Sequence, residues 1–410
     1  MSLFKKSSWL LFLAVLGPGI VVMFADTDAG SIITAAQSGA VWGYKLLPLQ
    51  LILIPVLYFA QELTVRLGLV TGMGHGELIK ARFGRWWAWL SVSTLVLSCI
   101  GAIFSEFSGV AGVGLLFGVP AWKSMLVVVT FLTVVAWTGS YLTVERIAIF
   151  IGLFELVFVY VAWKAHPSLG EILRSMQHFP ITNTSFLYLA AGNVGAVIMP
   201  WMIFYQQSAV LDKGLTPAQL TPARWDTLLG AIVTQTVMCA VLIMIAATIG
   251  KTNPGASLNT VHQISEALIP SLGEDIGRIL FAMGMLGAAL VAAIVVSLTA
   301  AWGLGEVLGF RRSLQDHPRE APWFYSTYTI TLIIGGVIVA SGINLVNLSV
   351  AVEVMNAFLL PIVLGFLFVL AWKVLPEHYR LKGNYAIFLG IVLGVTALFG
   401  LVAGVLGSIS

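Results

Sequence analysis

Long hydrophobic segments alternate with short polar segments along the whole chain. A membrane-spanning helix needs about 20 predominantly apolar residues, and eleven segments meet that requirement. They lie at about 9–40, 44–71, 87–117, 121–142, 146–165, 186–210, 226–250, 276–308, 323–341, 345–372 and 385–407. The pattern predicts an all-α integral membrane protein with about 11 transmembrane helices, built as a single transmembrane domain over residues 1–410.

The first and sixth spans contain residues that interrupt a helix. Span one carries Gly-Pro-Gly at 17–19 and Gly30, and span six carries Gly195 and Pro200. Proline removes a backbone donor and clashes with the preceding turn. Interrupted helices at matching positions of two halves are typical of inverted-repeat transporters. The two breaks lie five spans apart, so we predict oppositely oriented repeats at about 9–165 and 186–372, with an extra helix at about 385–407.

Two carboxylates, Asp26 and Asp28, lie in the middle of the first span, and the mostly apolar run 32–36 continues the span beyond them. An aspartate near the bilayer centre costs about 2.5–3.5 kcal/mol and is tolerated where it faces a cavity, a partner or an ion. The alternative is a pair of aspartates at a water-filled mouth, which the apolar run weakens. We therefore predict a cation site at this break.

Composition excludes a soluble globular protein. The 410 residues are 59% hydrophobic and 10% charged, with a mean hydropathy of +0.97, against about 45–50% and 25% in soluble domains. Cys99 and Cys239 both lie inside spans, so we expect neither a disulfide framework nor a cysteine metal cluster. The net charge is only +3, and the basic residues form no stripe with interleaved aromatic residues. We therefore expect no binding of nucleic acid.

The distribution of basic residues predicts the orientation. With the N-terminus inside, the outer side holds six of the 21 Lys and Arg residues and the inner loops hold the other fifteen, as the positive-inside rule requires. The outer six are Lys45, Lys123, Lys164, Arg174, Lys251 and Arg278. The segment from Lys5 to Leu16 resembles the start of a signal peptide but shows no cleavage pattern, so we expect it to be retained. We expect a multi-pass protein of the cell membrane.

Five further residues are candidates for ion handling. Met199, beside the proline of span six, is either a thioether ligand for a transition metal or an apolar filler. Ser31 is either a hydroxyl ligand or a small residue for close helix packing. Glu353 lies inside span ten, where an unpaired carboxylate indicates function. Glu106 and Glu155, inside spans three and five, either handle ions or protons or make structural hydrogen bonds.

Motifs for other chemistry are missing from the sequence. No Walker-type loop, nucleophile elbow or HExxH helix occurs, and the GxGxG at 72–76 follows a membrane helix rather than a strand. All six histidines fall in loops or at span ends, so the sequence predicts no imidazole relay within the membrane. We expect no enzymatic activity and no cofactor.

Several motifs together resemble one family. Residues 17–19 read Gly-Pro-Gly, 28–31 read Asp-Ala-Gly-Ser and 37–40 read Gln-Ser-Gly-Ala; residues 66–72 read Arg-Leu-Gly-Leu-Val-Thr-Gly, and 199–201 read Met-Pro-Trp. In order and spacing they are similar to motifs of the Nramp family of divalent metal transporters. The resemblance covers most of the chain and implies a LeuT-like fold of five plus five helices, with helices 1 and 6 broken.

The resemblance also implies roles for individual residues. Asp28 matches the family's metal-binding aspartate, Met199 its thioether ligand, and Ala196 a position whose backbone carbonyl coordinates the metal. Glu106 matches a glutamate of the family's proton pathway. The implied partners are a divalent metal ion as transported substrate, the lipid bilayer and, as a second candidate, protons.

The chain departs from the family at the implied metal site. Ser31 replaces the ligand asparagine, Asp26 stands where the family has an uncharged residue, and Glu353 matches a family glutamine. The implied site has thus gained carboxylates and lost an amide, which favours ions that prefer oxygen ligands.

The chain also departs from the family's proton route. Trp201 and Gln206 replace the two histidines of span six, and Ile103 replaces an acid three residues before Glu106. We therefore expect weak or absent proton coupling.

The most favoured interpretation is a secondary transporter that moves a divalent cation, a manganese-like ion first, into the cytoplasm. Its ligands would be Asp28, Met199 and the Ala196 carbonyl, with Asp26, Ser31 and Glu353 added or indirect. Two alternatives stay open at this point: a magnesium-type carrier, favoured by the additional carboxylates, and an amino-acid or organic-cation symporter on the same fold.

Overall fold

The computed structural model describes residues 15–138, 140–175, 179–266, 272–342 and 345–409, and every regular element in these ranges is a helix. The start of the expected first span, residues 9–14, lies outside the described residues. Nine helical segments in the described ranges are long and apolar enough to cross a membrane. One of them, Ala29–Thr71, contains parts of two expected spans, and the shorter apolar helix Ala121–Trp137 adds another, which agrees with about eleven spans.

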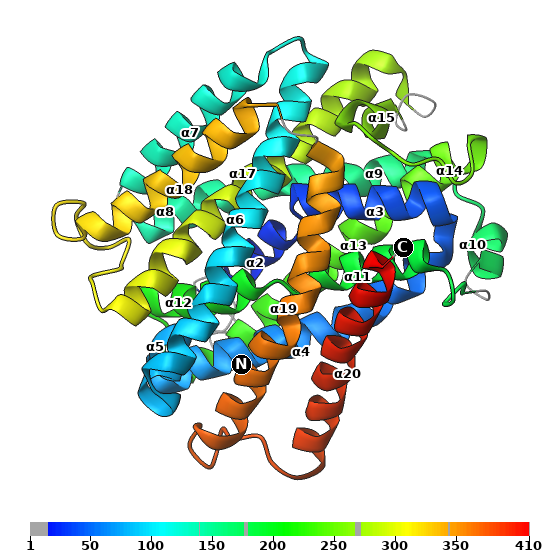
Figure 1. The fold of residues 1–410 in the computed structure, drawn as a ribbon. Helices are drawn as coiled ribbons and strands as arrows, with labels where there is room; N and C mark the ends of the chain where they lie inside the picture. The colour runs from blue at the N-terminus through cyan, green and yellow to red at the C-terminus, as the bar shows by residue number, and fades with distance from the viewer. Residues whose placement is uncertain (1–14, 139, 176–178, 267–271, 343–344, 410) are drawn as a thin grey trace, which may run out of the picture.

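The helices follow the chain with short connections (Figure 1). Those of the first half are α2 (Pro18–Asp26), α3 (Ala29–Trp42), η1 (Gly43–Leu46), α4 (Leu47–Thr71), α5 (His75–Phe83), α6 (Arg85–Leu116), α7 (Ala121–Trp137), α8 (Tyr141–Gly152), η2 (Leu153–Leu156), α9 (Val157–Lys164) and α10 (Leu169–Ser175). Those of the second half are α11 (Thr184–Val197), α12 (Pro200–Asp212), η3 (Pro217–Gln219), α13 (Leu220–Ala247), α14 (Ile249–Thr252), α15 (Val261–Glu266), α17 (Glu274–Leu308), α18 (Pro322–Ala340), α19 (Leu345–Lys373) and α20 (Gly383–Ser408).

Both predicted breaks are present. The first separates α2 from α3 at Thr27 and Asp28, and the second separates α11 from α12 at Ile198 and Met199. Asp28 caps the N-terminus of α3, because its side chain accepts a hydrogen bond from the backbone N–H of Ser31. Pro200 begins α12, a position where its missing N–H is no loss.

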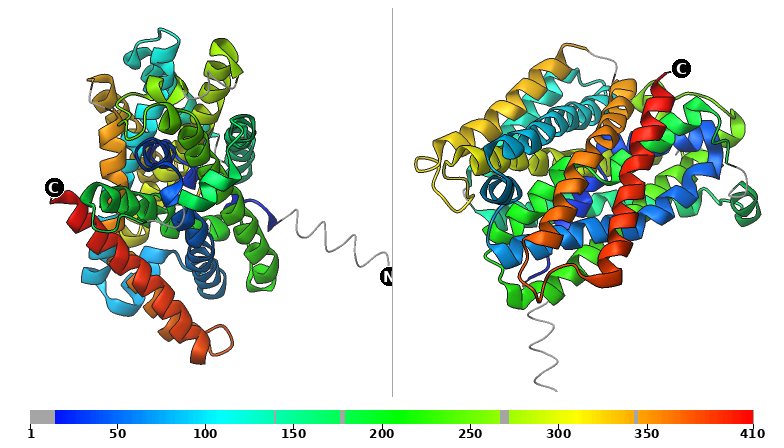
Figure 2. Two further views of the ribbon diagram at one scale, coloured as in Figure 1. Left: turned by 90° about the vertical axis from the view of Figure 1, so that its right-hand side faces the viewer. Right: turned by 60° about the horizontal axis from the view of Figure 1, so that its bottom comes forward.

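The broken helices lie inside the bundle, surrounded by longer helices (Figures 1 and 2). Helix α13 packs against α2, α3 and α4, and α17 packs along α6. Helix α11 contacts both α19 and α20, and α20 runs along the outside of the body in both views of Figure 2. The two breaks are therefore shielded from the surface by α6, α13, α17 and α19.

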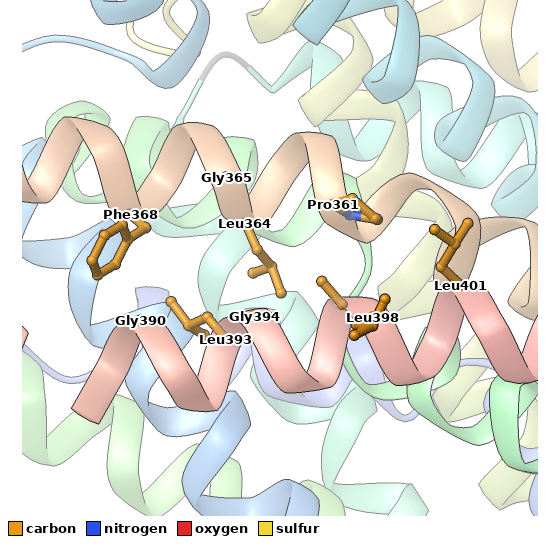
Figure 3. A pocket seen from close by; sticks show the side chains of 10 residues that line it. Pro361, Leu364, Gly365, Phe368, Gly390, Leu393, Gly394, Leu398 and Leu401 are labelled. Atoms are coloured by element: carbon orange, nitrogen blue, oxygen red, sulfur yellow. The ribbon is translucent and has the colours of Figure 1, made fainter. Parts of the chain in front are cut away.

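An apolar groove of about 340 Å³ lies between α19 and α20 (Figure 3). Its walls include Pro361, Leu364, Phe368 and Leu398, and Gly365 leaves part of it open. The groove holds no charged side chain, so it is a packing feature of the bundle surface and separate from the predicted cation site.

Close approach of α11 to α19 depends on Gly195. A Cβ atom at this position would overlap the backbone carbonyl of Glu353, and it would lie 2.8 Å from the backbone nitrogen of Ala357. Backbone atoms cannot rotate away from such a clash. The absence of a side chain at Gly195 therefore lets the second break lie against the part of α19 that carries Glu353.

We predict that Gly195→Ala destabilises the protein by about 1–3 kcal/mol, the usual range for overpacking a tight interface. The measurement is thermal unfolding of the purified protein in detergent. Gly365→Ala is the matched control, since no atom lies within 4 Å of a Cβ added there, and alanine in a helix is favoured over glycine by about 0.5–1 kcal/mol. Equal melting temperatures for the two variants would contradict this account of the α11–α19 contact.

Candidate functional site

Asp28 lies at the first break with one carboxylate oxygen fixed and the other free. Its Oδ1 accepts a hydrogen bond of 2.6 Å from the Ser31 N–H, and the side chain is fully buried. The second oxygen, Oδ2, is buried and has no hydrogen-bond partner. The cap therefore orients Asp28 and leaves one charged oxygen available to a ligand.

Ser31 and Ala196 bring the two breaks together. The Ser31 hydroxyl donates a 3.0 Å hydrogen bond to the backbone carbonyl of Ala196. In a continuous helix this carbonyl would accept from the residue four positions later, but that residue is Pro200, which has no N–H. Pro200 therefore leaves the Ala196 carbonyl without a helical donor, and this oxygen, which the family resemblance implies as a ligand, lies next to the Asp28 cap through Ser31.

Met199 is fully buried in the extended link between α11 and α12. Its side chain belongs to the main hydrophobic cluster of the bundle. The structure therefore places Met199 at the second break, three residues after Ala196, whose carbonyl accepts the Ser31 hydroxyl.

Glu353 reaches the first break from α19. Its Oε2 accepts a 3.0 Å hydrogen bond from the Asn356 amide, and its Oε1 has no partner. A Cβ atom added at Gly30 would overlap this free oxygen, so Glu353 lies directly against the first turn of α3. Asn356 is itself held by the Ser98 hydroxyl at 2.7 Å, which fixes the orientation of the Glu353 carboxylate.

Glu106 reaches the same break from α6. Its Oε2 accepts a 3.0 Å hydrogen bond from the backbone N–H of Ala29, the first residue of α3, and its Oε1 has no partner. The sequence left open whether Glu106 handles protons or makes a structural bond. The structure shows a bond to the N-terminus of a helix, where a carboxylate is stabilised by the helix dipole.

Asp26 and Glu155 lie on the other side of the break from this group. Asp26 Oδ2 accepts a 3.3 Å hydrogen bond from the Thr234 hydroxyl of α13, whereas its Oδ1 has no partner. Glu155, on η2, is fully buried and has two oxygens without a hydrogen-bond partner. The two aspartates of the first span therefore point to different neighbours, which their spacing in the sequence does not reveal.

Five carboxylates thus lie around the first break without a basic neighbour. Each has at most 1% of its surface exposed, and in the described part of the chain none forms an ion pair. They are Asp26, Asp28, Glu106, Glu155 and Glu353. Within the described ranges, no three His, Cys, Asp or Glu side chains converge as a metal site, so a metal here would need backbone or sulfur ligands besides carboxylates. A buried uncompensated charge is very unfavourable, which indicates that the arrangement is completed by cations or protons.

A second polar cluster, not anticipated from the sequence, holds the start of α2. The Asp226 carboxylate on α13 accepts hydrogen bonds from the backbone N–H groups of Gly17, Gly19 at 2.7 Å and Ile20 at 3.3 Å. Negative charge at a helix N-terminus is favourable. The Gly-Pro-Gly run was the available signal, because glycine lets another chain approach the backbone closely.

An ion pair supports the same end of α2. Lys213 lies 2.8 Å from Glu145 and also donates to the Leu16 carbonyl at 2.8 Å. Both side chains are nearly buried. Together with Asp226, the pair fixes the segment that leads into the broken helix.

His75, at the start of α5, is fully buried, although the sequence indicates only that it lies outside the spans. Its Nδ1 is 3.0 Å from Oε1 of Gln207. Burial lowers the pKa of His75 from its ordinary value of 6.5 to about 4. The imidazole therefore stays neutral near neutral pH.

Comparison with known proteins agrees with this geometry. The model of the family described as natural resistance-associated macrophage protein-like, Nramp, matches residues 19–405. The divalent metal cation transporter MntH of Staphylococcus aureus is 32% identical over 215 residues, which are 51% of this chain and 48% of that protein. MntH of Bradyrhizobium diazoefficiens is 26% identical over 305 residues, 71% of this chain and 67% of that protein. The match thus spans about half the length of the first relative and two thirds of the second.

Solved structures share the fold at low sequence identity. A manganese transporter of Eremococcus coleocola, in complex with an aromatic bis-isothiourea substituted compound, has a TM-score of 0.77 at 21% identity, over 97% of this chain and 87% of that one. MhsT in complex with L-phenylalanine has a TM-score of 0.64 at 13% identity, over 95% of this chain and 98% of that one. The family model covers most of the chain, and the broken helices are those that the resemblance implies. The chain therefore belongs to the Nramp family.

Proposed function

We propose that the protein is a secondary transporter that carries a divalent metal cation across the cell membrane into the cytoplasm. The preferred substrate in this proposal is a manganese-like transition-metal ion. The observation that carries the proposal is the junction of the two breaks, where the free oxygen of Asp28 lies beside the Ser31–Ala196 bond. Carboxylate and carbonyl oxygens suit divalent ions. Family membership and the names of the MntH relatives support the same function.

The proposed ligands are Asp28, the Ala196 carbonyl and the Met199 thioether. Ser31 is an added ligand that would exchange its hydrogen bond with Ala196 for the ion, and Glu353 is an indirect ligand beside Gly30. Asp26, which the sequence also suggests as a ligand, could contribute only indirectly, because it is bonded to Thr234. Met199 would favour transition metals, because thioethers prefer softer ions. We place the N-terminus in the cytoplasm, on the distribution of basic residues between the loops.

Magnesium-type transport is the second candidate function. The observation in its favour is the free oxygen of Glu353, which adds a carboxylate beside Asp28 and Glu106. A site with several carboxylates holds a hydrated hard ion well. Selectivity between the two candidates depends on whether Met199 contacts the ion.

We predict that Asp28→Ala lowers uptake of divalent metal into liposomes by roughly 30-fold or more, since losing one member of a buried charge pair costs about 2–5 kcal/mol. Folding should be retained, because loss of the Asp28 cap on α3 costs only about 0.5–2 kcal/mol and the native state then has one buried carboxylate fewer. Asp275→Ala, which removes an exposed carboxylate at the start of α17, is the control. Uptake by Asp28→Ala equal to that of the parent protein would disprove the site.

Met199→Ala should change selectivity rather than only the rate. We expect the ratio of manganese or cadmium uptake to magnesium or calcium uptake to fall by on the order of tenfold, about 1.4 kcal/mol. Met244→Ala controls for the cavity, because Met244 is equally buried but lies in α13. If the ratio stays constant, Met199 is a packing residue and the magnesium-type function becomes the better proposal.

We further propose that coupling to protons is weak or absent. Trp201 and Gln206 carry no group that titrates near neutral pH. The Gln206 side-chain amide donates a 2.9 Å hydrogen bond to the Thr227 hydroxyl. Glu106 is engaged at the first turn of α3. Uptake should therefore follow the metal gradient and the membrane potential.

Simultaneous recording of metal flux and internal pH in liposomes tests the coupling. Little acidification should accompany uptake by the parent protein. A stoichiometric proton influx that persists in Asp26→Asn but disappears in Glu106→Gln would refute weak coupling and make Glu106 the proton carrier.

A further inference from the structure

The oxygen atoms around Asp26 and Glu155 form a second cluster, which neighbours the Asp28 site and lies within electrostatic range of it. It lies where α2, η2 and α13 meet, and its members are the carboxylates Asp26 and Glu155 and the hydroxyls Thr27 and Thr234. The Asp28 group instead faces α3, α6, α11 and α19 through Ser31, Glu106, Ala196 and Glu353. No hydrogen bond of the described residues links the two groups.

Contacts within the cluster are made through the threonines. The hydroxyls of Thr27 and Thr234 are 2.6 Å apart, and Thr234 also contacts Asp26 Oδ2 at 3.3 Å. Glu155 lies beside Thr27 and within electrostatic range of Asp26. The carboxylate of Glu155 is fully buried next to the Thr27 hydroxyl, and among the described residues neither of its oxygens has a hydrogen-bond partner of normal geometry.

If all five carboxylates are ionised, their charge balance requires more than the transported ion. One divalent cation at Asp28 compensates two of the charges on Asp28, Glu106 and Glu353. Asp26 and Glu155 would still lie in the membrane interior as an uncompensated acidic pair, and two like charges in a low dielectric repel strongly. The described residues around them supply only hydroxyl groups and no basic side chain.

We propose that Asp26, Thr27, Glu155 and Thr234 form a second cation site, distinct from the transport site. All four contributions are oxygen atoms, which are the ligands of hard cations such as Na⁺ and Mg²⁺. No sulfur or nitrogen ligand takes part, in contrast to the site that includes Met199. A softer transition metal therefore has no preference for this cluster.

A cation at this place would join the end of α2 to η2 and to α13. It would stabilise α2 in the position seen here, where Asp226 already holds the other end of the helix. Because Asp28 follows Asp26 by two residues, binding at the two sites would be thermodynamically linked, and each cation would alter the affinity of the other by the same factor.

The experiment measures thermal unfolding of the full-length protein as a function of cation concentration. A cation that binds the native state raises the melting temperature. NaCl or MgCl₂ replaces choline chloride at constant ionic strength, so that the two arms distinguish Na⁺ from Mg²⁺. Asp28→Ala serves as the background, because it removes the transport site while leaving the second site intact.

We expect Na⁺ or Mg²⁺ to stabilise both the parent protein and Asp28→Ala. In the Asp28→Ala background, Glu155→Gln and Thr234→Val should each raise the concentration for half-maximal stabilisation by at least tenfold. Thr236→Val is the matched control, since the Thr236 hydroxyl is bonded to its own helix and faces outward. Two independent variants keep the test valid if one of them does not fold.

Three results would overturn the second site: no stabilisation of the parent protein by either cation, unchanged stabilisation in Glu155→Gln and Thr234→Val, or loss of stabilisation in Asp28→Ala alone. The first would mean that protons neutralise the pair. The assay does not measure transport, so its failure is distinguishable from failure of the proposed function, which is read from uptake by Asp28→Ala.

Discussion

The requirement that every polar group inside the membrane finds a partner governs this structure. A break in a spanning helix releases backbone groups that lipid cannot satisfy. Here the two breaks satisfy each other and their neighbours: Asp28 caps α3, Glu106 accepts from Ala29, and Ser31 donates to the Ala196 carbonyl. Among the buried oxygens that remain without a partner at the first break are those of Asp28, Glu106 and Glu353, and carboxylate oxygens are ligands that divalent cations accept.

Close approach of neighbouring helices at glycine positions makes this arrangement possible. Gly195 lets α11 lie against the backbone of α19, and Gly30 leaves space for the free oxygen of Glu353. At the start of α2, the Asp226 carboxylate accepts hydrogen bonds from the backbone N–H groups of Gly17 and Gly19. Glycine weakens a helix, but here it also lets α19 and Asp226 approach the backbone of the broken helices closely. The proposed transport needs such a segment, because the site must be ordered enough to bind an ion and the two broken helices must be able to separate to release it.

Sequence reasoning identified the spans, both breaks and the residues that surround them. Asp28, Ser31, Ala196 and Glu353 do meet at the first break, and the family is confirmed. Asp226, Glu145 and Lys213 were not anticipated, because each lies near the end of a span, where a charge is ordinary. The burial of His75 was also missed, since a short helix between two spans carries no periodic signal of its tertiary contacts.

The sequence by itself determined the helical class, the membrane environment and the positions of the breaks, because these follow from hydrophobic length and from the local chemistry of glycine and proline. Only the tertiary structure decided which of the five buried carboxylates lie with Asp28 and which lie with Asp26. Asp26 and Asp28 are two residues apart, yet the non-helical link between α2 and α3 directs one to Thr234 on α13 and the other to Ser31 on α3. Neighbours of a buried side chain are set by helices distant in the sequence, and no local pattern encodes which of them it will face.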